Sequence, residues 1–253
     1  MMELEMLGQI LEALALGGLL GGIGGLLGIG GGILAIPVLV MLYGMNQALA
    51  QGTALVMMTP NVLIGFWRYR QRNPFPLRTA VLIGLYSVIS TYPAARLAVN
   101  MDAGLLKQCF AAFLLLLAAY FLLDSRLRQA AGRPAWPETL LPLVGVVGGL
   151  FAGLFSVGAG IVAAPILVKG FGKKQAVAQG LALALVVPGA VVALWTYGRA
   201  GHIDWQLGLP MALGGVCTVS QGVAWAHRLP ESRLKQLFAL MLMVTALLMS
   251  RHA

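Results

Sequence analysis

The chain has 253 residues, of which 59% are hydrophobic and only 10% are charged. A soluble domain carries about 25% charged residues, so this composition excludes an ordinary soluble domain and predicts an all-α integral membrane protein. The net charge of +9 comes from basic residues in short loops, a pattern typical of cytoplasmic loops and not of a nucleic-acid-binding surface.

The first section, residues 7–44, is rich in glycine and is not expected to form one plain helix. The tract GIGGG at 28–32 has no side chains to pack and a high cost of helical ordering, so it predicts a break. The stretch after it, 33–44, would be about 18 Å long as a helix, too short to cross about 30 Å of hydrocarbon. The earlier glycines, 17–25, favour close helix packing. We therefore expect a hairpin or a pair of short helices.

Three ordinary spans follow, at residues 47–67, 77–98 and 103–124. Gln47 and Gln51 lie one turn apart in the first span, and a buried amide is costly unless it is hydrogen-bonded. Gln51 should therefore face the interior, either as a ligand of a substrate or as a bond between helices. Arg96 near the end of the second span is a candidate partner for an anion, although an arginine there also fits a snorkelling position at the interface.

The second half of the chain repeats the first without a gap. Residues 21–69 and 149–197 share 21 identities in 49 positions at an offset of 128 residues. This predicts two homologous halves, 1–123 and 139–253, joined by a polar cytoplasmic linker at 124–138. In the second half we expect a broken section at 139–171, with its break at 156–160, and spans at 175–195, 205–226 and 231–250. Internal duplication is the common architecture of secondary transporters.

Loop charges differ between equivalent positions of the two halves. The 68–78 loop carries four arginines, whereas its counterpart at 196–206 carries one arginine and one aspartate. The 41–46 turn is uncharged, whereas 169–174 carries three lysines. Because basic loops stay in the cytoplasm, this switch predicts inverted repeats, with the N-terminus outside.

The two breaks are the predicted binding site. A helix that begins after such a break directs free N–H groups and a positive dipole end at its surroundings, which suits an anion. Close packing of backbones and interhelical hydrogen bonds are the alternative interpretations. Thr53 and Ser156, which face Leu181 and Gly28 across the repeat, could adapt the site to an asymmetric ligand. The candidate substrate-binding residues are Gly30, Gly31, Gly32, Gln51, Thr53, Arg96, Ser156, Gly158, Ala159, Gly160 and Gln179.

No catalytic, metal or cofactor site is predicted. The sequence has no His, Asp, Glu and Cys cluster with metal-ligand spacing, and its two cysteines, Cys109 and Cys217, lie in apolar runs. A membrane enzyme would need titratable groups inside the bilayer, and the apolar runs hold almost none. We therefore expect a protein that is not an enzyme.

The stretches GIGGGILAIPVLVMLYGMNQALAQGTAL and SVGAGIVAAPILVKGFGKKQAVAQGLAL resemble the two signature regions of the TauE/SafE sulfite exporters, also called TSUP anion permeases. The resemblance covers essentially the whole chain. It implies a multi-pass transporter of a bacterial inner membrane that exports small sulfur-containing anions, such as sulfite or organosulfonates, by alternating access.

Other functions stay open beside that expectation. The thiosulfate-uptake permeases use a cysteine relay, and Cys109 and Cys217 do not match it, because they are not separated by the 128-residue repeat. A passive anion channel and an uptake permease for thiosulfate or sulfate remain alternatives, and a homodimer in the lipid bilayer is left open.

Overall fold

The computed structural model describes residues 2–27, 30–126, 136–157, 160–226 and 242–243, and every regular element in these ranges is a helix. The first half contains α1 (Met2–Leu27), α2 (Gly32–Leu42), α3 (Gln47–Arg72), α4 (Leu77–Val99) and α5 (Ala103–Arg126). The second contains η1 (Glu138–Leu140), α6 (Leu141–Phe155), α7 (Gly160–Lys169), α8 (Gln175–Arg199) and α9 (Trp205–Ala226). The span expected at 231–250 lies outside the described residues except for 242–243.

The helix boundaries repeat at the same offset as the sequence. The helices α1 and α6 end 128 residues apart, at Leu27 and Phe155. Three further pairs begin 128 residues apart: α2 and α7 at Gly32 and Gly160, α3 and α8 at Gln47 and Gln175, and α4 and α9 at Leu77 and Trp205. Each half thus opens with two helices separated by a break, as the glycine tracts predicted. The division into halves at 1–123 and 139–253 stays a prediction that this repetition supports.

Seven of the described helices are long and apolar enough to cross a membrane, whereas α2 and α7 are too short. The protein is therefore a multi-pass membrane protein. α1 is longer than the short helix that we expected, because it runs for 26 residues and includes the glycines between Gly17 and Gly25 without a break. These glycines stay helical where they contact another helix.

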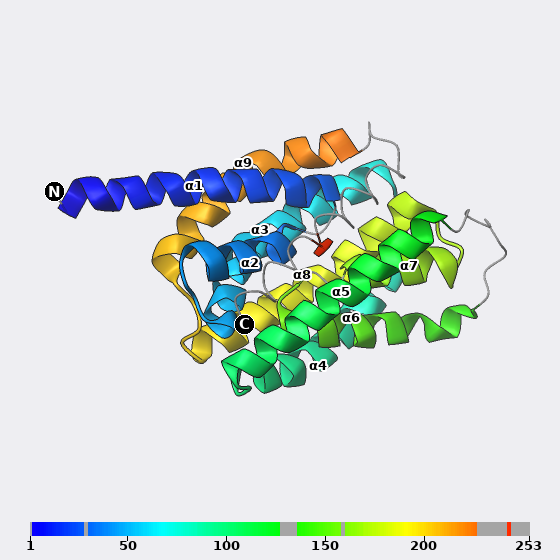
Figure 1. Ribbon diagram of the computed structural model, residues 1–253. Coiled ribbons are helices and arrows are strands. Elements are labelled where there is room, and N and C mark those ends of the chain that lie inside the picture. The colour runs from blue at the N-terminus through cyan, green and yellow to red at the C-terminus, as the bar shows by residue number, and fades with distance from the viewer. Residues whose placement is uncertain (1, 28–29, 127–135, 158–159, 227–241, 244–253) are drawn as a thin grey trace.

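The first helix of each half packs along a helix of the other half. Figure 1 shows α1 and α9 side by side. In both contacts, the first helix carries glycines one turn apart. In α1, these are Gly17, Gly21 and Gly25, which lie against the backbone of Met211, Gly215 and Val219 in α9. In α6, they are Gly145, Gly149 and Gly153, which lie against Ile83, Ser87 and Thr91 in α4. A Cβ at Gly21 would lie 2.4 Å from Gly215 Cα, so only glycine permits this approach. Both pairs run parallel, because residue numbers rise together along each contact.

The helices α3 and α8 form the contact between equivalent elements of the two halves. Tyr197, near the end of α8, bonds to Gln51, near the start of α3, whereas Gly65 late in α3 lies beside Leu183 early in α8. These contacts make α3 and α8 antiparallel. An antiparallel crossing of equivalent helices supports the inverted arrangement, which stays a prediction.

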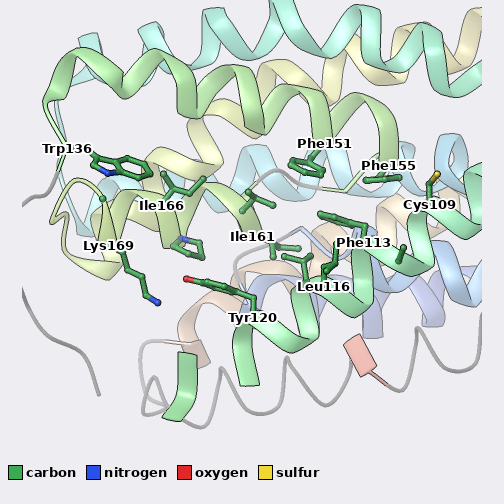
Figure 2. Close-up of a pocket in the computed structure, with 15 residues that line it drawn as sticks. Cys109, Phe113, Leu116, Tyr120, Trp136, Phe151, Phe155, Ile161, Ile166 and Lys169 are labelled. Atoms are coloured by element: carbon green, nitrogen blue, oxygen red, sulfur yellow. The ribbon is translucent and has the colours of Figure 1, made fainter. Parts of the chain in front are cut away.

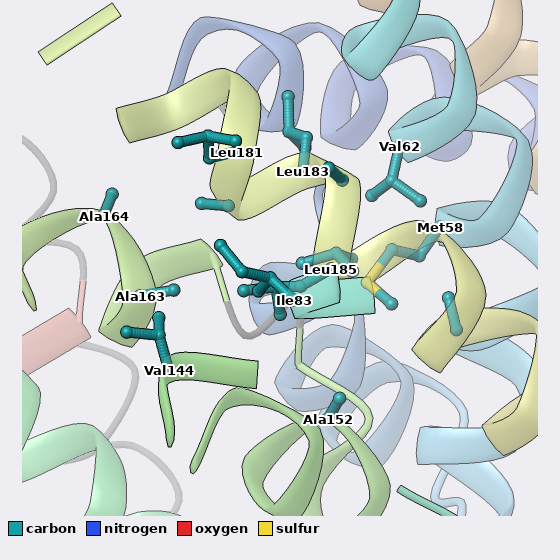
Figure 3. Packing of buried hydrophobic residues seen from close by; sticks show 14 of the residues in the cluster. Met58, Val62, Ile83, Val144, Ala152, Ala163, Ala164, Leu181, Leu183 and Leu185 are labelled. Carbon is teal, nitrogen blue, oxygen red and sulfur yellow. The ribbon is translucent and has the colours of Figure 1, made fainter. Parts of the chain in front are cut away.

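Apolar side chains fill the space around this crossing. Figure 3 shows Met58 and Val62 of α3 opposite Leu183 and Leu185 of α8. All four side chains are almost completely buried. Because lipid is as apolar as these residues, tight packing rather than the hydrophobic effect holds such helices together.

The loop of each half packs against the start of a helix in the other half. The His202 carbonyl approaches Gly52 of α3, and the Phe75 ring approaches Gly180 of α8. Gly52 and Gly180 are equivalent positions of the repeat, so both glycines have the same role: they leave room for the loop from the opposite half.

Basic residues gather at one end of the bundle. The turn after α3 holds Phe75, which contacts α8 close to the turn at 170–174. The arginines at 68–78 and the lysines at 169–174 therefore lie at the same end (Figure 1). The positive-inside rule would place this end in the cytoplasm.

Candidate functional site

The first helix break turns at two glycines in the left-handed region. Gly30 and Gly31 have φ angles of 74° and 86°, a conformation that costs other residues about 1–2 kcal/mol. A Cβ on Gly31 would lie 2.7 Å from the Leu20 carbonyl oxygen and 3.2 Å from Met57 Cε. Gly31 therefore serves the turn and also lets α1 and α3 approach each other.

The second break begins at Ser156, directly after α6. Its φ of 51° makes it the one non-glycine residue with a positive φ in the described chain. Ser156 is fully buried, and its Oγ has no hydrogen-bond partner of good geometry among the described residues. Strained residues of this kind cluster at functional sites. Gly160, buried, begins α7, and Gly158 and Ala159 lie outside the described residues.

The two breaks meet in the interior. The Ser156 carbonyl oxygen lies 3.3 Å from the position that a Cβ on Gly32 would occupy. Gly32 is the first residue of α2, and the first amides of a helix have no partner within that helix. The start of α2 therefore faces the end of α6, and a side chain at Gly32 would separate them.

Gln51 and Tyr197 form a buried polar pair beside the second break. The Tyr197 hydroxyl donates to Gln51 Oε1 at 2.6 Å and lies 3.4 Å from the Gly153 carbonyl oxygen in α6. It also faces the side chain of Ser156. Gln51 Nε2 has no acceptor among the described residues, although the side chain is fully buried. An unsatisfied buried donor costs about 1–3 kcal/mol, so this N–H group is a candidate ligand of a substrate.

Gln179, the repeat partner of Gln51, uses its amide differently. Gln179 Nε2 donates to the carbonyl oxygen of Leu27, the last residue of α1, at 3.3 Å. This bond satisfies a carbonyl that the helix end leaves without a partner. Gln51 and Gln179 therefore both reach a break, but Gln179 has a backbone partner, whereas the N–H group of Gln51 has none.

Thr53 and Arg96 lie apart from the meeting point of the breaks. Thr53 is fully buried, and its Oγ1 accepts a hydrogen bond from the Asp204 N–H at 3.0 Å. Its hydroxyl thus holds the loop before α9. Arg96 is exposed in the last turn of α4. The structure puts Gly32 against Ser156, and Tyr197 links Ser156 to Gln51. Gly30 and Gly31 form the turn of the first break, where Gln179 bonds to the end of α1.

Two further buried amides lie on the same face of α3 as Gln51. Gln47 and Asn61 are 2% and 0% exposed, and neither side-chain oxygen nor nitrogen has a partner in the described chain. Gln51 and Asn61 follow Gln47 by four and fourteen residues, which is close to a whole number of helical turns, so the three amides lie on one face of α3. Asn61 lies against Gly215 of α9. α3 thus carries a buried polar stripe.

Tyr197 and Asn61 were missed as site residues in the sequence. Tyr197 could have been found, because the repeat pairs it with Tyr69 and a buried tyrosine normally needs a hydrogen-bond partner. Asn61 has no such signal, since its repeat partner is Gly189.

The described residues of the site offer hydrogen-bond donors, and none of their buried side chains is charged. The start of α2 lies against Ser156, and the Tyr197 hydroxyl, which bonds to Gln51, faces the Ser156 side chain. The N-terminal end of α2 adds a positive dipole. Within the described ranges, no group of three His, Cys, Asp or Glu side chains could hold a metal ion. Such a donor set suits a small anion.

Comparisons with known proteins show the family to which the chain is similar. A family model described as "Sulfite exporter TauE/SafE" matches residues 13–249. A "Probable membrane transporter protein" of Methanocaldococcus jannaschii is 30% identical over 65% of this chain and 63% of its own length. One with the same description from Xylella fastidiosa is 27% identical over 91% of each chain. No solved structure matches the chain significantly.

Proposed function

The chain belongs to the sulfite exporter TauE/SafE family and is a membrane transporter of that type, and from this we propose that it exports small sulfur-containing anions such as sulfite or organosulfonates. The observation that carries the proposal is the meeting of the two breaks, where Gly32 lies against Ser156. Tyr197 links this point to Gln51, whose Nε2 has no acceptor among the described residues. The relatives are transporters, so the chain is not an enzyme.

The donor set predicts modest affinity for an anion. A helix N-terminus contributes about 0.3–1 kcal/mol when exposed and up to about 2 kcal/mol when partly buried. A hydrogen bond from Gln51 to a charged ligand adds about 1.5–3 kcal/mol. These contributions sum to at most about 5 kcal/mol, which corresponds to a Kd of roughly 200 μM, so we expect binding in the high micromolar range or weaker. A carrier that must release its load needs binding of this strength.

The shape of the ligand also follows from the donors. Sulfite and sulfonates share a pyramidal face of three oxygens, which can accept several N–H bonds at once, and bonds to an ionised acceptor are the stronger ones. No acidic side chain is buried among the described residues, which disfavours a cation in the interior.

The arrangement of the halves supports an alternating-access mechanism. α3 and α8 cross antiparallel, and the first helix of each half packs on the other half. In secondary transporters, inverted halves rock around a site formed by broken helices, which exposes the site to each side in turn. We place the protein in a bacterial inner membrane, with the basic end in the cytoplasm.

Calorimetric titration of the purified protein tests the proposed substrate class. We expect heat of binding with sulfite or a short organosulfonate, and none with ammonium or a neutral amine of the same size. Binding of the cation or the amine in preference to every sulfur anion would contradict the proposal. Thiosulfate or sulfate as the preferred ligand would favour the uptake-permease alternative.

A further inference from the structure

The loop between α8 and α9, residues 200–204, joins the ends of two helices that cross at the site. The His202 N–H donates to the Tyr197 carbonyl oxygen at 3.0 Å, which ties the loop to α8. The Asp204 N–H donates to Thr53 Oγ1 at 3.0 Å, which ties the loop to α3. The loop lies at the end of the bundle opposite the basic turns, here called the outer end. The end of α8 and the start of α3 are therefore fastened together there.

The loop covers the turn of α3 that carries Gln51. Three consecutive residues of α3 each contact the end of α8 or the loop: Gln51 contacts Tyr197, Gly52 contacts His202, and Thr53 contacts Asp204. The three α3 residues are buried, whereas His202 and Asp204 are partly exposed. The loop therefore shields this part of the site from the outer surface.

Both ends of the loop are fixed to the helices beside it. Gly201, with a φ of 75°, follows the end of α8, and its N–H donates to the Gly198 carbonyl oxygen at 3.1 Å. Asp204 Oδ1 accepts the Leu207 N–H at 3.1 Å and so caps the start of α9. The loop thus has little slack, so its bonds to α8 and to α3 cannot both survive when the two helix ends move apart.

The inner end of the bundle cannot form the same bond. The repeat pairs Thr53 with Leu181 and Asp204 with Pro76. A leucine side chain offers no acceptor, and proline has no N–H to donate. At the inner end the Phe75 ring lies against Gly180 instead. The bond from Asp204 to Thr53 therefore distinguishes the outer end from the inner end.

We propose that the bond from the Asp204 N–H to Thr53 is a latch that holds the site closed toward the outer side. The proposal rests on the alternating-access mechanism proposed above. Opening toward the outer side must separate the start of α3 from the end of α8 and break the bond, whereas opening toward the cytoplasm leaves it in place. The latch thus favours the state that binds substrate from the cytoplasm, which an exporter needs for loading. One hydrogen bond of ordinary strength shifts such an equilibrium roughly three- to tenfold.

Labelling of a single cysteine at the second break tests the latch. The reporter is Ser156→Cys in a background without Cys109 and Cys217. Figure 2 shows Phe155, directly before Ser156, facing Phe113 of α5, and the two ring centroids lie 4.8 Å apart. Because this stack fixes the end of α6, labelling reports access to the break. With a membrane-impermeant methanethiosulfonate reagent added outside spheroplasts, Thr53→Val should label roughly three- to tenfold faster than the parent. Labelling needs no sulfite, so its outcome is independent of the proposed substrate class.

Two matched variants and the opposite membrane face complete the test. Thr53→Ser keeps the hydroxyl and should label at the parent rate. So should Thr59→Val, because the Thr59 hydroxyl donates to the Leu55 carbonyl oxygen of its own helix at 2.7 Å. In inside-out vesicles, Thr53→Val should label more slowly than the parent, since more of the protein is open outward. Equal outside labelling of Thr53→Val and the parent would overturn the proposal. So would faster labelling of Thr53→Val from both faces, which would mark the bond as a general support of the fold.

Discussion

At the scale of single residues, the binding argument depends on how Gln51 is used. Its oxygen accepts the Tyr197 hydroxyl, and its nitrogen is buried without an acceptor among the described residues. Gln179, at the equivalent position, donates its nitrogen to the end of α1. One amide is thus available to a ligand, whereas the other has a backbone partner. The asymmetry lets two similar halves bind one small molecule.

The first prediction separates these two amides. Gln51→Leu should weaken sulfite binding by about 1–2 kcal/mol, or roughly 5- to 30-fold in Kd, because it removes an N–H donor. Gln179→Leu should leave Kd nearly unchanged and lower the free energy of unfolding by about 1 kcal/mol. Calorimetry and thermal unfolding measure the two effects. Tyr197→Phe is the control, since it removes the bond to Gln51 but keeps the amide. An equal loss of affinity in both glutamine variants would contradict this assignment.

The second prediction concerns Gly31. Gly31→Val should abolish transport, since the residue has a φ of 86° and its Cβ would press on Leu20 and Met57. Gly44 is the matched control: its φ is 61°, but nothing lies within 4 Å of its Cβ position. Gly44→Val should therefore keep transport and cost only the strain of the left-handed region. Normal sulfite transport by Gly31→Val would show that this break does not need glycine.

The residues of the site could be predicted only in part. Gln51 and the glycines of the breaks could be named as candidates because the repeat marks them and because a polar group or a run of glycine is unusual in an apolar stretch; their role in binding stays a prediction. The use of Thr53 for the loop before α9 could not be foreseen, because it depends on a contact 151 residues away along the chain. Asn61 was missed for a similar reason: only the packing of α3 shows that it is buried.

At the scale of elements, glycine has two opposite roles in this protein. At 30 and 31 it ends one helix and begins another, whereas at 17, 21 and 25 it stays inside α1. The difference comes from the neighbours, since α9 lies close enough to take the place of the missing side chains. The sequence predicted where α3, α4, α8 and α9 begin, because polar turns precede apolar runs there. It could not predict the full length of α1, which depends on that contact.

The third prediction tests the packing of α1. Gly21→Ala should lower the free energy of unfolding by about 1–3 kcal/mol, because its Cβ would lie 2.4 Å from Gly215 Cα. Gly22→Ala is the control on the same helix, with its Cβ at an ordinary 3.7 Å from Thr218. That variant should be neutral or more stable, since alanine favours a helix. Thermal unfolding in detergent measures both; equal stabilities would show that α1 is not held by this contact.

At the scale of the whole molecule, two similar halves interlock so that neither is complete alone. α1 packs on α9, and α6 packs on α4. The loop before α9 contacts Gly52 of α3, and the turn after α3 contacts Gly180 of α8. Basic side chains gather at one end of the bundle. This arrangement supports inverted halves around a shared site, a geometry that many alternating-access transporters have.

The fourth prediction tests the inverted orientation. Single cysteines at Gln71 and Gly201, in a background without Cys109 and Cys217, should react with a membrane-impermeant reagent from opposite sides of the membrane. Gln71 is exposed in the last turn of α3, and Gly201 is exposed in the turn after α8, so the two positions belong to equivalent hairpins. We expect Gln71 to be labelled from the cytoplasmic side. Labelling of both from the same side would contradict inverted repeats.

Counterflow in proteoliposomes decides whether the protein carries sulfur anions through the site at the two breaks. Radiolabelled sulfite should enter faster when the vesicles contain unlabelled sulfite, because a carrier returns to the outer face more quickly when loaded. Gln51→Leu should need a higher sulfite concentration for the same rate, and Gly44→Val should behave like the wild-type protein. Uptake that is indifferent to internal sulfite would indicate a passive channel and contradict alternating access, and an unchanged concentration dependence in Gln51→Leu would contradict the site.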